Sequence, residues 1–361
     1  MRPDVVITSA LGRHAVSRYL LVRVDTDAGL HGIGEATVTP VWSGETAVGA
    51  RHLIHEYLAP ALAGRDPTDI AGAVAAMDRA AFGNPFAKAA LEMALFDLWG
   101  MSEGRPVFEL LGGACRPLAL PIRFSLASGS PEGTAALAAQ KVREGFRTLK
   151  VKVGTDPAAD AARVRAVREA IGPQVALTVD ANGGWSAEDA IRTVREMAPL
   201  DLTLVEQPTP RDDLDAMAQV RRAIDVPVMA DESVFTLADA REVLKREAAD
   251  VISIYPGKNG GLLRCLQIAA LAAEAGVACA IGSNLELDVA TAAMCHLAVA
   301  APNIAAERFP GDILGPLYYS EPVVREPIRY SGGTVHCPEG PGLGIEAAAR
   351  WMPPGEQSAF P

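Results

Sequence analysis

The chain of 361 residues is 49% apolar and 21% charged, which is typical of a globular protein with a substantial core. Its net charge of −11 argues against a nucleic-acid or membrane-surface partner, because both need a basic footprint on the protein. It has no run of about 18 apolar residues that would predict a transmembrane helix. Its five cysteines are widely spaced, with no CxxC or zinc-like cluster, so we predict a protein of the reducing cytoplasm.

The N-terminal part of the chain has an α+β pattern. Residues 18–37 predict an antiparallel hairpin, and helical patterns follow over residues 45–60 and 67–101. We assign residues 1–118 to this domain. We expect the Pro- and Gly-rich tail, residues 320–361, to pack back onto it and complete it.

After residue 118, short apolar strands alternate with amphipathic helices. We predict strands over residues 119–126, 148–153, 175–180, 202–206, 226–231, 251–257, 278–282 and 304–308. From the second strand onward, the predicted starts are 24 to 27 residues apart. A strand and a helix repeated to eight strands are typical of an α/β barrel, here over residues 119–319. A doubly wound open sheet is the alternative, but no GxGxxG motif opens its first unit.

Three consecutive predicted strands end in an acidic residue. Asp180, Glu206 and Asp231 follow strands three, four and five, one repeat apart. The carboxyl ends of barrel strands meet at one face, where three uncompensated carboxylates would repel one another. A hard divalent cation, Mg²⁺ or Mn²⁺, would resolve this repulsion with oxygen ligands. The alternatives are solvent-exposed loop acids and a structural ion site without catalysis.

Lysines stand on both sides of these acids in strand order. Lys150 and Lys152 end strand two, and Lys258 follows strand six. A substrate on the metal would then have a lysine at each face, which suits proton transfer at a carbon next to a carboxylate. We expect Lys150 and the cation to lower the pKa of Lys152, so that Lys152 is neutral often enough to act as a base. The alternative is that these lysines extend into solvent.

Other polar residues at the strand ends are predicted to contact the substrate or support the site. They are Asn182, Gln207, Glu232, Ser283, Asn284 and Glu286. His296 stands in a predicted helix, where packing is the simpler interpretation.

The motifs Lys150-Val-Lys152, Asp180-Ala-Asn182, Glu206-Gln-Pro208, Asp231-Glu-Ser233 and Lys258-Asn-Gly-Gly261, in this order, resemble those of the enolase superfamily. Within it, the chain resembles the muconate lactonizing enzyme subgroup over essentially its whole length. The resemblance implies a (β/α)7β barrel under an α+β capping domain, and a homo-oligomer. It also implies Mg²⁺ or Mn²⁺ on the three acids, Lys152 as the acid/base, Lys258 as its partner on the opposite face, and Lys150 as a neighbour.

The resemblance leaves the reaction open. The leading hypothesis is a muconate-type cycloisomerase acting on a small carboxylate. The alternatives are a racemase, epimerase or dehydratase, including N-acylamino acid racemase, o-succinylbenzoate synthase and hydroxyproline-type chemistry. The related mandelate racemase subgroup has a histidine after strand seven, where this chain has Ser283 and Asn284. A Schiff-base lyase or aldolase and a non-catalytic protein are hypotheses of other classes.

Two regions bear on the substrate. Residues 311–324, GDILGPLYYSEPVV, resemble the strand-eight region of muconate cycloisomerases, where an acidic residue precedes an LFGPL-like run. Asp312 matches that acidic position, as an Asp where a Glu is expected. Dipeptide epimerases tend to carry an Asp-x-Asp pair at this place to hold the substrate amine, and this chain lacks the pair. The loops of the cap that would close the site hold Arg13, His14 and Trp42. We expect Arg13 or His14 either to meet a distal polar or anionic group or to be exposed.

Overall fold

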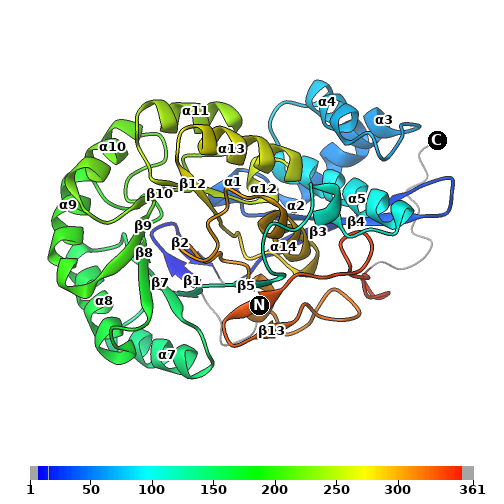
Figure 1. Cartoon of the computed structure of the whole chain (residues 1–361). Helices are drawn as coiled ribbons and strands as arrows, with labels where there is room; N and C mark the ends of the chain where they lie inside the picture. Colours follow the sequence, from blue (N-terminus) through cyan, green and yellow to red (C-terminus); the bar gives the residue numbers. More distant parts are fainter. Residues whose placement is uncertain (1–6, 15, 352–361) are drawn as a thin grey trace.

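The computed structural model describes residues 7–14 and 16–351, and its centre is a curled parallel sheet with helices on its outer face (Figure 1). The sheet has seven strands in the order β12-β11-β10-β9-β8-β7-β6. Their bounds are β6 Phe124–Leu126, β7 Thr148–Lys152, β8 Ala176–Asp180, β9 Leu202–Glu206, β10 Val228–Ala230, β11 Val251–Ile254 and β12 Ala278–Ile281. The predicted α/β barrel is confirmed.

Helices follow each of these strands along the chain. They are α7 Pro131–Arg143, α8 Pro157–Ile171, α9 Ala187–Glu196, the short 3₁₀ helix η2 Ala198–Leu200, α10 Leu214–Ala223, α11 Leu237–Lys245, α12 Pro256–Asn259, α13 Leu262–Glu274 and α14 Asp288–Ala300. In α8, the side chain of Asp156 accepts a hydrogen bond from the backbone of Ala159 and caps the helix. The predicted apolar stripe of α8 is buried, as Ala161, Val164 and Val167 show.

The prediction of a last barrel strand at residues 304–308 is wrong. Only Ile304 bridges β12, at Cys279. The amides of Arg308 and Phe309 turn back onto the carbonyl of Ala305 instead of continuing a ladder. The barrel closes through a second isolated bridge, between Ile122 and Gly311.

Two further predicted strands are shorter or divided. The strand predicted at 251–257 ends at Ile254, because Pro256 has no N–H for the ladder and begins α12 instead. The segment 119–126 is divided into β5 Ala119–Pro121 and β6.

Most of the N-terminal cap lies to one side of the barrel, whereas its first two strands, in residues 7–14, lie beside the barrel strands (Figure 1). Its predicted hairpin is confirmed as β3 Arg18–Asp25 and β4 His31–Val38. Long helix α5 Pro85–Glu103 packs against β4 so closely that a Cβ on Gly34 would lie 1.7 Å from the carbonyl oxygen of Ala90. The remaining cap elements are β1 Ile7–Ser9, β2 Gly12–His14, α1 Pro40–Ser43, α2 Ala47–Leu53, the π-helical turn η1 Ile54–Leu58, α3 Ala59–Leu62, α4 Ile70–Ala80 and α6 Val107–Leu110. Within the described part of the chain, no helix has both the length and the apolar character needed to cross a bilayer.

The C-terminal tail contacts both domains. After the 3₁₀ helix η3 Gly315–Tyr318, the strands β13 Tyr330–Ser331 and β14 Thr334–His336 form an antiparallel sheet with β5. The backbone N–H of Leu343 donates to Asp97 on α5. The domain boundary at residues 118/119 stays a prediction. His296 packs in α14, where it accepts a hydrogen bond from the amide of Phe108 and contacts the carbonyl of Leu343.

Candidate active site

One cavity of about 140 Å³ is lined by the carboxyl ends of the barrel strands and by the cap. Most residues that the sequence predicts for the site line this cavity: Arg13, His14, Trp42, Lys150, Lys152, Asp180, Asn182, Glu206, Asp231, Ser283, Asn284 and Asp312. The other four are buried, and each forms a hydrogen bond with a residue of the cavity: Gln207, Glu232, Lys258 and Glu286. The structure therefore brings the predicted residues together.

The three strand-end acids are almost completely buried. Asp180 and Glu206 are the last residues of β8 and β9 and are direct partners in the parallel register, and Asp231 follows β10. Their relative exposures are 0%, 1% and 5%. Buried carboxylates are costly unless a cation offsets their charge, so the arrangement of nearby ammonium groups decides what this site can hold.

Lys152 contacts the first of these acids. Its Nζ donates to Oδ2 of Asp180 at 2.5 Å and to Oδ1 of Asn182 at 2.9 Å. Burial raises the pKa of Asp180, but the charges of Lys152 and Lys150 outweigh it, so that the pKa lies well below its usual range. Lys152 is thus a partly buried ammonium group held at the cavity wall by two oxygen acceptors.

Lys150 is more deeply buried than Lys152 and contacts other acids as well. Its Nζ lies 2.6 Å from Oδ2 of Asp312 and 3.1 Å from Oε2 of Glu206. Burial lowers the pKa of Lys150, but Asp312 and Glu206 raise it overall, above its usual range. Lys150 also lies 3.2 Å from Oδ2 of Asp180, so it is held as a cation by three acids.

Asp312 is bound by protein cations rather than left open to a ligand. Arg123 donates from Nε to Oδ1 at 2.9 Å and from Nη2 to Oδ2 at 2.7 Å, and Lys150 also contacts Oδ2. Asp312 is predicted to bind the substrate or to support the site, and its ion pairs with Arg123 and Lys150 favour the supporting role, although it also lines the cavity. Sequence reasoning missed Arg123, although an arginine among the apolar residues of the predicted strand 119–126 was an available signal.

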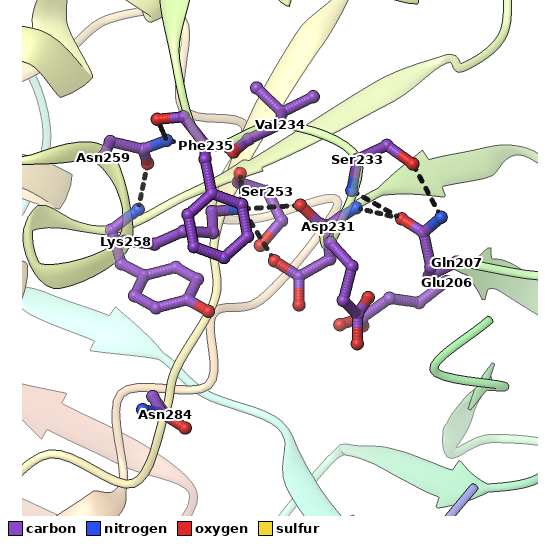
Figure 2. Close-up of polar contacts among 12 residues, drawn as sticks. Glu206, Gln207, Asp231, Ser233, Val234, Phe235, Ser253, Lys258, Asn259 and Asn284 are labelled. Atoms are coloured by element: carbon purple, nitrogen blue, oxygen red, sulfur yellow. Dashed lines mark hydrogen bonds and ion pairs between the residues drawn. The ribbon is translucent and has the colours of Figure 1, made fainter. Parts of the chain in front are cut away.

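Lys258 is completely buried against Asp231 (Figure 2). Its Nζ donates to Oδ1 of Asp231 at 2.7 Å, to the carbonyl of Asp231 at 2.9 Å and to the carbonyl of Ser253 at 2.7 Å. The ring of Tyr255 lies 4.9 Å from the ammonium group on another side. Lys258 does not line the cavity itself.

Gln207 and Asn259 fix the backbone around Asp231 and Lys258 (Figure 2). Oε1 of Gln207 accepts from the amides of Asp231 and Ser233 at 2.9 and 3.2 Å, and its Nε2 donates to Oγ of Ser233 at 2.7 Å. Asn259 ties the turn that carries Lys258 to the carbonyl of Val234. The side-chain amides of Gln207 and Asn259 thus hold Asp231 and Lys258 in place without lining the cavity.

The donor set fits a hard divalent cation. Asp180, Glu206 and Asp231 offer only oxygen ligands at one cavity. Burial and then the charge of Asp180 raise the pKa of Glu206 to about 7, and burial and then the charge of Asp231 raise that of Glu232 to about 8. Oε2 of Glu232 is buried and finds no hydrogen-bond partner among the described residues. In residues 7–14 and 16–351, no group of three or more His, Cys, Asp or Glu side chains is arranged to hold a metal ion, and lysines contact an oxygen of each of the three acids.

The cap supplies the other wall of the cavity. Arg13 and His14 come from β2, and Trp42 from α1 donates to Oε1 of Glu232 at 3.3 Å and stacks on Tyr255. Burial lowers the pKa of His14. Arg13 is exposed to solvent as well as lining the cavity, and among the described residues no carboxylate lies within ion-pair distance of it.

The loop after β12 joins the cap to the barrel. Nδ2 of Asn284 donates to the carbonyl of Thr37 at 2.8 Å, and Glu286 accepts from Oγ of Ser283 at 2.5 Å and from the amide of Asn284 at 2.9 Å. Several lining residues were not predicted: Ile7, Ser9, Leu11, Gly12, Thr39, Val41, Ser125, Leu285, Leu314 and Tyr318. Many of them are apolar, and a search for polar residues at strand ends does not find them.

Comparison with known proteins covers nearly the whole chain. Residues 2–112 match the family described as mandelate racemase / muconate lactonizing enzyme, N-terminal domain, and residues 133–351 match enolase C-terminal domain-like. Muconate cycloisomerase 1 of Rhodococcus opacus is 39% identical over 350 residues, which cover 96% of this chain and 92% of that protein. L-Ala-D/L-Glu epimerase of Bacillus subtilis is 40% identical over 333 residues, which cover 91% and 89%.

The fold agrees with these matches. The crystal structure of N-succinyl Arg/Lys racemase from Bacillus cereus has a TM-score of 0.92 at 32% identity and covers 96% of this chain and 92% of that chain. These three relatives are a cycloisomerase, an epimerase and a racemase, so similarity alone does not assign a substrate. The chain belongs to the mandelate racemase / muconate lactonizing enzyme family of the enolase superfamily, and it is an enzyme of the isomerase class.

Proposed function

We propose that this enzyme is a metal-dependent cycloisomerase of a muconate-type dicarboxylate. The observation that carries the proposal is the make-up of one cavity, which the strand-end acids and Lys152 of the barrel line together with Arg13 of the cap. A dicarboxylate has one carboxylate for the metal and a second for the guanidinium.

Asp180, Glu206 and Asp231 would hold Mg²⁺ or Mn²⁺. When bound, the cation supplies electrostatic stabilisation of the negative charge that develops on the substrate carboxylate. Glu232, the residue after Asp231, has an Oε2 that lacks a protein partner among the described residues and so adds a further acid oxygen beside these ligands.

Lys152 is the proposed proton donor. In a muconate, an oxygen of one carboxylate adds to the double bond conjugated with the other carboxylate and closes a lactone ring. The electron pair of that double bond moves to the carbon alpha to the second carboxylate, and this carbon takes one proton. Lys152 lines the cavity and its ammonium group donates to Asp180 and Asn182, which supports its role as the donor of that proton.

Two features favour this reaction over dipeptide epimerisation. The second acid of the Asp-x-Asp pair expected in dipeptide epimerases would stand at position 314, where Leu314 lines the cavity. The first, Asp312, is bound by Arg123 and Lys150. Neither position offers a free carboxylate to a substrate ammonium group.

The second candidate is racemisation of an N-succinyl amino acid. Arg13 favours it equally, because a succinyl group also carries a distal carboxylate. Racemisation needs a proton acceptor and a donor on opposite faces of one carbon. Lys258, the predicted second lysine, is fully buried against Asp231, so we place this reaction second.

The test is a set of substrates incubated with the Mg²⁺ enzyme in D₂O and followed by NMR. We expect cis,cis-muconate to give a lactone with one deuterium at the carbon alpha to the free carboxylate. N-succinyl amino acids and Ala-Glu dipeptides should keep their alpha protons. Exchange of the alpha proton of an N-succinyl amino acid, without turnover of muconate, would assign the racemase instead.

A further inference from the structure

The barrel is closed at its irregular seam by a buried ion pair. The eighth strand is replaced by the isolated bridge between Ile122 and Gly311, supported by the amide of Arg123, which donates to the carbonyl of Gly311 at 3.0 Å. The next residues on the two sides of this bridge are Arg123 and Asp312. Their side chains meet inside the barrel with relative exposures of 1% and 4%.

This pair is continuous with the candidate metal site. Nη2 of Arg123 donates both to Asp312 and, at 2.8 Å, to Oε2 of Glu206. Lys150 also contacts both acids, at 2.6 Å to Asp312 and 3.1 Å to Glu206. Each of the two cations thus contacts both acids, and Lys150 also lies 3.2 Å from Oδ2 of Asp180.

We propose that Arg123 and Asp312 are positioning residues for the metal site, an inference that rests on the proposed function. Arg123 and Lys150 hold the carboxylate of Glu206 from inside the barrel, and Asp312 holds both cations. Groups that orient a metal ligand commonly change metal affinity by 10- to 100-fold when they are altered. The planar fork of arginine is what allows one side chain to bridge Asp312 and Glu206, and a lysine has no such fork.

Asp312 therefore acts through Lys150 and Arg123 rather than on the substrate. Both of its oxygens are engaged by protein cations, three contacts in all between 2.6 and 2.9 Å. A substrate ammonium or hydroxyl group would have to displace a buried charged donor to bind it, which is costly.

The test measures Mn²⁺ binding to the substrate-free enzyme by electron paramagnetic resonance, for wild type, Arg123→Lys, Asp312→Asn and the double variant. We expect each single variant to weaken Mn²⁺ binding about tenfold. The double variant should be no weaker than the weaker single variant, within about a factor of two, because both substitutions break one network. Asp312→Asn is nearly isosteric and keeps an oxygen acceptor for a cation, so it carries the test even where Arg123→Lys loses stability.

Arg221→Lys is the matched control. Arg221 forms an ion pair with Asp250 at 2.9 Å on the outside of the barrel, so its replacement should leave Mn²⁺ affinity unchanged. Unchanged Mn²⁺ affinity in Asp312→Asn, with a raised KM for substrate, would overturn the positioning role and make Asp312 a substrate contact. Additive losses, about a hundredfold in the double variant, would also overturn it. A wild-type enzyme that binds no Mn²⁺ would instead defeat the proposed function, and this inference with it.

Discussion

Replacing Lys152 by methionine is expected to lower kcat about a thousandfold, because the carbon alpha to the substrate carboxylate loses its proton donor. General acid–base groups contribute about 10²- to 10⁴-fold to catalysis. Methionine keeps the length of the side chain but removes the ammonium group that contacts Asp180 and Asn182. The measurement is steady-state turnover of cis,cis-muconate, followed by its loss of ultraviolet absorbance.

The matched control for this prediction is Lys245→Met. Lys245 stands at the end of α11 with 78% of its side chain exposed, so its replacement should leave turnover unchanged. The urea unfolding midpoint shows whether each variant is folded. A folded Lys152→Met enzyme with wild-type turnover would mean that another group delivers the proton.

Removing divalent cations is expected to abolish turnover, and Mg²⁺ or Mn²⁺ should restore it. A bound divalent cation typically stabilises the charge of the transition state by several kcal/mol, so its removal should lower the rate about a thousandfold or more. Dialysis against EDTA followed by titration with each metal measures the effect.

The variant Glu206→Gln should stay inactive after metal is returned, because an amide oxygen replaces one of the three carboxylates.

Glu242→Gln serves as the control for that variant, since Glu242 lies on α11 with its side chain 47% exposed. The turnover of Glu242→Gln should recover fully when Mg²⁺ is returned. Activity that survives EDTA, together with trapping of substrate on Lys152 by borohydride, would replace the metal mechanism by a Schiff base.

Much of the site is predictable from two regular patterns: the alternation of side chains along a strand and the repeat of strand and helix around the barrel. In β7, alternation places Lys150 and Lys152 on the same face of the strand, and both line the cavity. The β/α repeat then brings Asp180, Glu206 and Asp231 to the same end of the barrel. These residues could be predicted because their positions depend only on local patterns and on the number of strands.

The partners of these residues could not be predicted in the same way. Arg123 and Asp312 are 189 residues apart, and no local pattern shows that they meet. The eighth strand was predicted from its apolar residues, whereas hydrogen bonds to the carbonyl of Ala305 turn the chain there. The burial of Lys258 follows from α12, which begins at Pro256 and turns the lysine toward the carbonyls of Asp231 and Ser253.

The most direct measurement is a crystal structure of the enzyme with Mg²⁺ and the lactone formed from cis,cis-muconate. We predict that Asp180, Glu206 and Asp231 bind the cation and that Nζ of Lys152 lies about 3–3.5 Å from the carbon alpha to the free carboxylate. A cation bound elsewhere, or a different acid group next to that carbon with Lys152 turned away, would contradict the proposed mechanism.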